Sequence, residues 1–184
     1  MSLAHFWIPI VASAVLVFVA SSIIHMALKW HRSDFRGFPE EESVRAAIRA
    51  SGAPPGEYLV PYCADMKDMG TPEMRRKFEE GPIAYVALRA PQVPSMGKPL
   101  GLWFVYSLAV SAIAGYVASK ALPAGASLTD VCRVTGTIAF LAYTGGSVQS
   151  GIWMGKRWRN VAMDALDGAI YGLVTGAAFG WLWR

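Results

Sequence analysis

The sequence has little charge for its length. Lys, Arg, Asp and Glu make up 16% of the 184 residues, whereas soluble domains carry roughly 25%. The shortage is local, because none of these four residue types occurs between His5 and Leu28. About 20 apolar residues are enough to cross a hydrocarbon core of about 30 Å. We therefore predict a membrane protein whose first transmembrane helix lies within residues 1–29. We expect it to be retained as an anchor, since no Lys or Arg precedes it.

Cysteine is also scarce, and so are the motifs of known enzyme classes. Cys63 and Cys132 are the two cysteines, which excludes a disulfide framework and a paired-cysteine zinc site. The sequence has no GxxxxGK[ST], GxGxxG, HExxH or GxSxG motif, which would mark nucleotide, zinc or acyl-transfer chemistry. No basic run is interleaved with aromatic residues, as a nucleic-acid surface would require. We expect a non-catalytic protein with no resident cofactor and no nucleic-acid partner.

Glycine, in contrast, is regularly placed in the last apolar stretch. Four glycines recur there at every fourth position: Gly168, Gly172, Gly176 and Gly180. A helix has about 3.6 residues per turn, so this spacing places them along one side. Small residues let two helix backbones approach closely in a membrane. The stripe predicts a helix-packing surface, which faces either another helix of this chain or a second protein.

Three further spans are expected after the polar stretch, in the membrane segment 99–184. They lie at residues 100–119, 131–154 and 161–183. Two of them carry a stripe of small residues as well. These stripes consist of Ser107, Ser111, Gly115 and Ser119, and of Ser147, Gly151 and Gly155. The expected fold class is therefore mainly α, a polytopic membrane protein with four transmembrane helices packed as a bundle.

The polar residues 30–98 form the remaining part of the expected fold. Their pattern predicts the order helix, strand, helix, strand, at residues 39–52, 57–62, 71–81 and 83–89. Pro39 and the acidic residues after it are typical of a helix start, and Thr71 before Pro72 is typical of an N-cap. About 60 residues are marginal for an independent fold. We expect a small α/β or helix-rich unit that depends on the membrane, an oligomer or a partner.

The placement of basic residues predicts the orientation in the membrane. The side of the first and third loops carries Lys29, Arg32, Arg36, Arg45, Arg89, Lys98, Lys156, Arg157 and Arg159. The opposite side carries Lys120, Arg133 and Arg184. Because basic residues concentrate on the cytoplasmic side, we predict that both termini lie outside and that residues 30–98 are cytoplasmic. Cys63 and Cys132 would then lie on opposite sides and could not form a disulfide.

Polar residues in the predicted spans form the first candidate site. Asp164 and Asp167 share one face of the last span, and His25 and Gln149 lie at a similar depth. Charged groups inside a bilayer are costly and often mark an ion or proton pathway. The structural alternative is that Asp164 pairs with the helix N-terminus and nearby Lys156 or Arg157. In that alternative, Asp167 accepts a hydrogen bond from Gln149.

A sulfur-containing segment forms the second candidate site. Cys63, Met66 and Met69 recur at every third position, and soft sulfur ligands select Cu(I). Met74 and His31 are additional candidate ligands. The structural alternative is that the methionines are adaptable apolar filler.

The overall pattern of the chain resembles small four-span proteins of bacterial inner membranes that carry no assigned activity, and three segments are its main features. They are the span that ends near His25, the segment FRGFPEEE at 35–42 and the segment TGAAFGWLW at 175–183. The resemblance implies a location in the bacterial inner membrane and supplies no catalytic residue.

Three functional hypotheses follow. The leading one is an accessory, assembly or stabilising subunit of a larger membrane complex, with respiratory complexes among the candidates. Its partners would be membrane lipids and either that complex or further copies of the chain. The rival is a small homo-oligomeric proton or cation channel or transporter that uses His25, Asp164 and Asp167. The third is a copper-handling protein that uses Cys63, Met66 and Met69.

Overall fold

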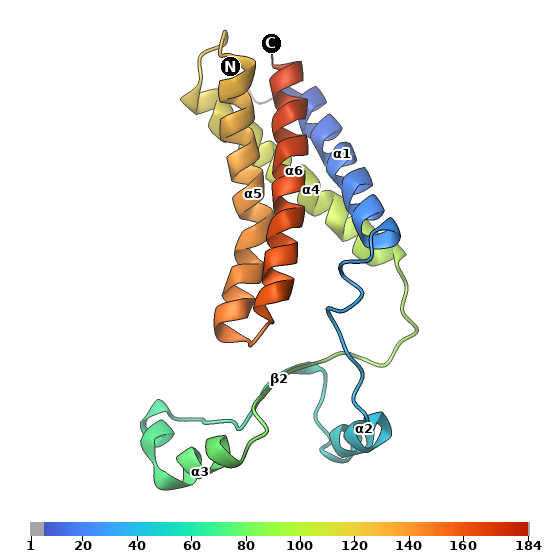
Figure 1. The fold of residues 1–184 in the computed structure, drawn as a ribbon, viewed down its shortest axis with the longest axis vertical. Helices are drawn as coiled ribbons and strands as arrows, with labels where there is room; N and C mark the ends of the chain where they lie inside the picture. Colours follow the sequence, from blue (N-terminus) through green and yellow to red (C-terminus); the bar gives the residue numbers. More distant parts are fainter. Residues whose placement is uncertain (1–5, 184) are drawn as a thin grey trace. The chain divides into compact units, whose positions relative to one another are not determined.

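The computed structural model describes residues 6–183, whose regular structure is mainly α-helical (Figure 1). The chain divides into two compact units. Unit 1 contains the residues before Arg36 and after Pro94, and unit 2 contains Arg36–Pro94. Each unit has its own secondary structure and is described separately.

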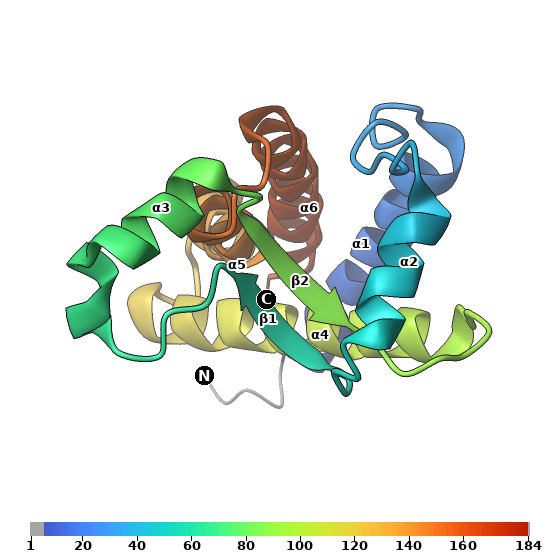
Figure 2. The ribbon, with the colours of Figure 1, turned by 90° about the horizontal axis from the view of Figure 1, so that it is seen from below.

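Unit 1 is built from four long helices. They are α1 (Trp7–Ala27), α4 (Gly97–Ala121), α5 (Leu128–Trp153) and α6 (Trp158–Leu182). The contact between α5 and α6 is the most extensive, α1 packs against α6 and α4, and α4 also packs against α5. Each helix therefore has two neighbours, and α4 crosses the others obliquely (Figures 1 and 2).

Three of these helices are long and apolar enough to cross a membrane, namely α1, α4 and α6. This finding confirms a mainly helical protein with three helices that could span a membrane, and it fits a membrane protein. The fourth predicted span, residues 131–154, is not shown within the described residues. Helix α5 is long enough at 26 residues, but Arg133, Gln149 and several Thr, Ser and Gly residues lower its hydropathy.

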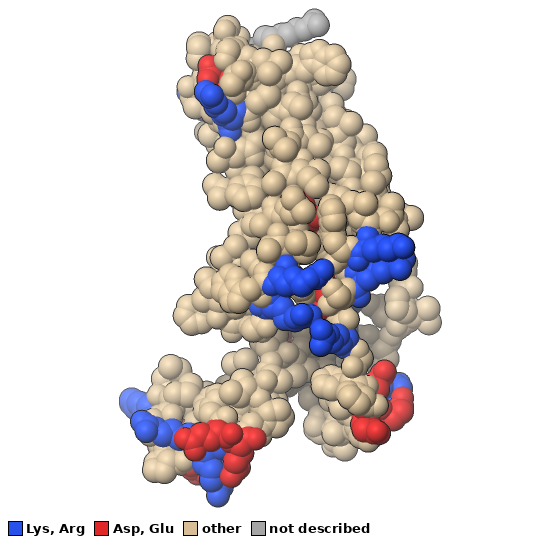
Figure 3. All heavy atoms as spheres, viewed as in Figure 1, with Lys and Arg blue, Asp and Glu red and all other residues tan. Residues whose placement is uncertain are grey.

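The surface and the interior of unit 1 have the reverse polarity of a soluble protein. Large apolar side chains such as Val15, Ile113 and Leu173 are exposed. Small hydroxyl residues are buried instead, and the Ser13 hydroxyl donates to that of Ser111 at 2.7 Å. Figure 3 shows Lys and Arg side chains gathered near the ends of unit 1, with most of the surface between them free of both. This distribution is typical of a protein surrounded by lipid.

The glycine stripe of α6 faces α5 of the same chain. A Cβ atom added at Gly172 would lie 2.7 Å from the carbonyl oxygen of Gly136. One added at Gly176 would lie 2.9 Å from the carbonyl oxygen of Cys132. These distances leave no room for a side chain between the two backbones. The stripe is therefore a packing surface, and its direct contact is intramolecular.

The other two predicted stripes agree with the structure only in part. Ser107 and Ser111 are fully buried in α4, and a Cβ atom at Gly115 would lie 2.9 Å from the ring of Phe179. Ser119 is only half-buried, because it lies at the edge of this contact.

The predicted α5 stripe accounts for only part of the surface that α5 packs against α6. The residues of α5 that meet the α6 glycines are Leu128, Cys132, Gly136, Phe140 and Thr144. Gly155 lies beyond the end of α5, in a turn with φ +69°. Ser147 and Gly151 instead face the first turns of α6, where Ser147 donates to Asp164 and Gly151 approaches Val161 and Trp158.

Unit 2 has the predicted order of elements. Its elements are α2 (Glu41–Ala50), β1 (Gly56–Val60), the 3₁₀ helix η2 (Met66–Gly70), α3 (Pro72–Glu80) and β2 (Ala84–Leu88). The strands pair antiparallel, with Gly56 opposite Leu88. The Thr71 hydroxyl caps α3 by accepting from the Met74 amide at 3.3 Å. Pro39, expected in the first helical turn, precedes α2, and β1 ends before Pro61.

A close contact between two backbones predicts a large effect of a single methyl group. We expect Gly176→Ala to lower stability by about 1–3 kcal/mol, because the added Cβ overpacks the α5–α6 contact. The control is Gly145→Ala, since a Cβ atom at Gly145 would meet nothing within 4 Å and alanine favours the helix. Thermal unfolding in detergent measures both variants. Equal midpoints for the two variants would contradict the intramolecular contact.

Candidate functional site

A cluster of two histidines and two aspartates lies where α1 ends and α6 begins. His25 belongs to the last turn of α1, His31 and Asp34 to the segment that follows it, and Asp167 to α6. Segments more than a hundred residues apart in the chain therefore meet at this end of unit 1.

The chain folds back at this point for local reasons. After α1, the Arg32 amide donates to the Lys29 carbonyl at 3.1 Å, and the Asp34 amide donates to the His31 carbonyl at 3.1 Å. These two successive turns direct His31 towards α6. The first turn of α6 then fixes the segment, because the side-chain amide of Asn160 (Nδ2) donates to the backbone carbonyl of Asp34 at 3.1 Å.

The two histidine rings present the same ring nitrogen to one carboxylate oxygen. His31 Nε2 lies 2.8 Å from Asp167 Oδ2, and His25 Nε2 lies 4.0 Å from the same oxygen. The opposite nitrogen of each ring is also engaged. His25 Nδ1 lies 3.0 Å from the Ser21 carbonyl oxygen, and His31 Nδ1 lies 2.6 Å from Asp34 Oδ2. The rings are stacked, with centroids 4.7 Å apart and planes 4° from parallel.

The cluster is buried on one side and open on the other. The side chain of Asp167 is 7% exposed and that of His31 is 14% exposed. The side chain of His25 is 55% exposed. Asp167 Oδ1 is buried without a hydrogen-bond partner. A small ion could therefore reach the buried carboxylate from the side of His25.

Basic side chains lie near the cluster, but they pair with Asp164 and Asp34 rather than with Asp167. Lys156 forms an ion pair with Asp164, which also accepts a hydrogen bond from Ser147. Arg159 Nη1 lies 3.8 Å from Asp34 Oδ1. Asp167 has only histidines as its cationic partners among the described residues.

The environment of His31, which lies after α1, favours its protonated form. Burial alone lowers the pKa of His31, but hydrogen bonds and attraction from Asp34 and Asp167 outweigh this effect and raise the pKa above its usual value. In the absence of any other cation, a proton on His31 therefore compensates part of the buried negative charge.

The structure brings together only some of the predicted pathway residues. His25 and Asp167 belong to one cluster, whereas Asp164 pairs with Lys156 as in the structural alternative. The expected hydrogen bond between Gln149 and Asp167 is wrong. Gln149 is exposed, and His31 occupies the position beside Asp167 instead.

The predicted copper ligands do not form a comparable cluster. Cys63 is half-buried before η2, and its thiol donates to the Asp65 carbonyl oxygen at 3.0 Å. Met66 and Met69 are both exposed. His31, which the sequence suggested as an additional copper ligand, belongs to the Asp167 cluster. The copper hypothesis stays a prediction that no contact in the described part of the chain supports.

Sequence reasoning missed Asp34, and it considered His31 for the copper site rather than for the Asp167 cluster. The usable signal was that His31 and Asp34 lie three residues apart directly after a span. Their approach to Asp167 depends on the two turns after α1, which the sequence pattern does not show.

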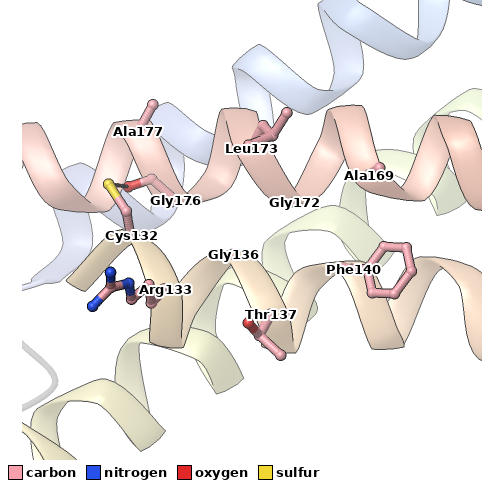
Figure 4. A pocket seen from close by; sticks show the side chains of 10 residues that line it. All are labelled: Cys132, Arg133, Gly136, Thr137, Phe140, Ala169, Gly172, Leu173, Gly176 and Ala177. Carbon is pink, nitrogen blue, oxygen red and sulfur yellow. Dashed lines mark hydrogen bonds between the residues drawn. The ribbon is translucent and has the colours of Figure 1, made fainter. Parts of the chain in front are cut away.

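A groove runs along the outer side of the α5–α6 contact (Figure 4). It has a volume of about 570 Å³ and is lined mainly by small and apolar residues, with Arg133 at one end. Gly136, Gly172 and Gly176 contribute to its floor, so the same glycines that bring the helices together leave the surface hollow.

The chain matches no protein-family model, and comparison with curated proteins and with solved structures found no match either.

The raised pKa of His31 predicts a pH dependence. A group with a raised folded pKa stabilises the protein below its unfolded pKa, and this contribution is lost as the pH rises through the folded pKa. We therefore expect the protein, treated with a chelator so that no metal ion replaces the proton on His31, to lose stability as the pH rises above about 6.5. Asp34→Asn should bring the pKa of His31 down, as measured by ¹⁵N NMR of the imidazole. Asp130→Asn, in the first turn of α5, is the control. An unchanged His31 titration in Asp34→Asn would contradict the assignment.

Proposed function

We propose that this protein is a non-catalytic accessory, assembly or stabilising subunit of a larger complex in the bacterial inner membrane, with respiratory complexes among the candidates. The observation that carries the proposal is the surface of unit 2. Within this unit only Met74 is buried among the large apolar residues. A unit of this size that buries so little apolar surface has little to offset its conformational entropy.

The exposed apolar residues of unit 2 support a protein partner. Leu59, Tyr62 and Ile83 lie in or directly beside the strands, and Phe38 and Val93 lie near the two ends of the unit. Large exposed apolar patches on a soluble domain are typical of interaction sites. A partner that covers these side chains would complete the core that unit 2 lacks.

The packing of α5 along α6 supports a four-span arrangement. The contact extends from Leu128 beside Gly180 to Thr144 beside Gly168. Because α5 follows α6 over this length, α5 crosses any bilayer that α6 crosses. The polar residues that lower its hydropathy do not prevent this, since part of its surface is shielded by α6.

The basic residues support the proposed orientation. Lys156, Arg157 and Arg159 lie at the end of unit 1 where α6 begins. Lys120 and Arg133 lie at the opposite end, near the α4–α5 connection. By the positive-inside rule, we propose that both termini are outside and that unit 2 is cytoplasmic.

The channel hypothesis has weaker support. The approach of His25 to Asp167 is its one favourable observation. Asp164 is neutralised by Lys156, and Gln149 is exposed away from the cluster. We therefore keep the accessory subunit as the proposed function.

The partner proposal predicts that the native particle is larger than this chain and contains other proteins. Purification from its native membrane in mild detergent, followed by mass measurement and identification of the components, tests this. We expect Ile83→Ser to reduce recovery of the partner at least several-fold, because it removes an exposed apolar contact. Arg75→Ser, at an exposed position of α3, is the control. A particle that contains this chain alone would refute the proposal.

The topology predicts which cysteines an impermeant maleimide labels. In inside-out vesicles we expect Cys63 and Met154→Cys to be labelled from the cytoplasmic side, the latter in a cysteine-free background. We expect Gly125→Cys, in the connection between α4 and α5, to react only from the other side. If Gly125→Cys and Met154→Cys react from the same side, α5 does not span the membrane.

A further inference from the structure

We propose that His25, His31 and Asp167 bind a divalent first-row transition metal ion such as Zn²⁺. This inference is independent of the proposed subunit function, because it rests on unit 1 alone and requires no partner. It goes beyond the predicted ion pathway, because it assigns a fixed site with a defined ligand set that includes His31.

The donor atoms are already close enough for one ion. His25, His31 and Asp167 each offer one donor atom, and these three atoms lie within 4.8 Å of one another. Asp167 Oδ2 lies 2.8 Å from His31 Nε2 and 4.0 Å from His25 Nε2. Zinc binds imidazole nitrogen at about 2.0–2.1 Å and carboxylate oxygen at about 2.0–2.2 Å. Ligands at such distances in a tetrahedral site lie about 3.3–3.5 Å apart. The His31–Asp167 pair would lengthen slightly, and the exposed ring of His25 would move inward.

The outer nitrogens of both rings are held in the way that metal ligands require. A metal-binding histidine usually donates its second N–H to a carbonyl or a carboxylate, which fixes the ring and its tautomer. His25 Nδ1 faces the Ser21 carbonyl at 3.0 Å, so this nitrogen carries the proton and Nε2 is free. His31 Nδ1 faces Asp34 Oδ2 at 2.6 Å in the same manner. Asp34 is therefore a positioning residue rather than a ligand.

The charge of the cluster points to a missing cation. Lys156 neutralises Asp164, and Arg159 lies near Asp34. Asp167 is more than nine-tenths buried, and its Oδ1 atom has no partner. A buried carboxylate without a permanent cation beside it is unfavourable, and among the described residues only a protonated histidine compensates Asp167. A metal ion beside Oδ2 would compensate this charge and could also engage Oδ1.

The ligand set indicates the class of metal. Two imidazoles and one carboxylate suit borderline divalent ions such as Zn²⁺ and Fe²⁺, whereas Cu(I) prefers sulfur. The exposed side of His25 leaves room for water at the remaining positions. The ion would link the end of α1, the turn after it and α6.

The structure holds a second group of close donors, His31, Asp34 and Asp164. It is the poorer site, because Asp34 and Asp164 already have Arg159 and Lys156 beside them. A metal ion there would have to displace resident cations. We therefore assign the ion to the first group.

Titration of the full-length protein with Zn²⁺ tests the proposal. The protein should be untagged, purified in detergent, treated with a chelator and desalted before calorimetry. We expect about one Zn²⁺ per chain. Co²⁺ should give visible absorption bands without the intense thiolate-to-cobalt band that cysteine ligands produce. The double variant Cys63→Ser, Cys132→Ser should bind as the parent does.

One ligand variant and one variant of a positioning residue test the ligand set. We expect His25→Ala to weaken Zn²⁺ binding at least about 100-fold, since loss of outer partners alone costs about 10–100-fold. This variant should fold normally, because His25 is exposed and the His31–Asp167 contact remains. Asp34→Asn should weaken binding by about 10–100-fold. Zn²⁺ should raise the unfolding temperature of the parent but not of His25→Ala.

Two results would overturn the proposal. One is a parent protein that takes up no Zn²⁺ or Co²⁺, which would leave the cluster as a proton-linked ion pair. The other is uptake that His25→Ala leaves unchanged. Neither result bears on the partner of unit 2, so failure of this proposal is distinguishable from failure of the proposed function.

Discussion

The close approach of α5 and α6 is the contact on which the rest of unit 1 depends. Carbonyl oxygens of α5 lie only 2.7 Å and 2.9 Å from the positions that a Cβ atom would take on Gly172 and Gly176. This spacing is available only to glycine, and in water four glycines in one helix would cost several kcal/mol of helix stability. In a bilayer the helix is maintained because its backbone has no other hydrogen-bond partners. A bilayer would thus permit a sequence that is a poor helix in water, and the glycines provide the tight packing.

Helix α6 uses its remaining surface for two different purposes. Towards α1 it buries Tyr171, which packs with Val17 and Ile24. Near its start it presents Asp167 to the histidines that follow α1. The tight contact with α5 fixes the position of α6, and the contact with α1 brings His25 to the same depth as Asp167. The geometry of the polar cluster is therefore a consequence of helix packing, because Asp167 lies 136 residues from His31 in the sequence.

Hydropathy and spacing could predict the long helices but not the pairs of surfaces that meet. Apolar length located α1, α4 and α6, and the four glycines of α6 indicated a packing surface. The part of α5 that meets these glycines was not predicted, because Cys132, Phe140 and Thr144 are not small enough to form a recognisable stripe. His25 and Asp167 were predicted because charge and imidazole are rare in spans. His31 was assigned elsewhere, because its approach to Asp167 depends on two turns that leave no periodic signal.

The buried carboxylate of Asp167 distinguishes structural from functional explanations of the cluster. A helix that needed only packing at this position would carry an apolar residue, since removing a charge from water is costly even when it is paired. Asp164, one turn earlier, has such a pairing with Lys156. Asp167 instead contacts imidazole groups. An imidazole carries a positive charge only when it is protonated, and a metal ion that binds its neutral form supplies the positive charge in place of the proton. A site of this composition would exchange its compensating cation with solution, whereas the neighbouring Lys156–Asp164 pair keeps its cation permanently. An exchangeable cation is what a binding site requires, and a structural ion pair such as Lys156–Asp164 does not provide it.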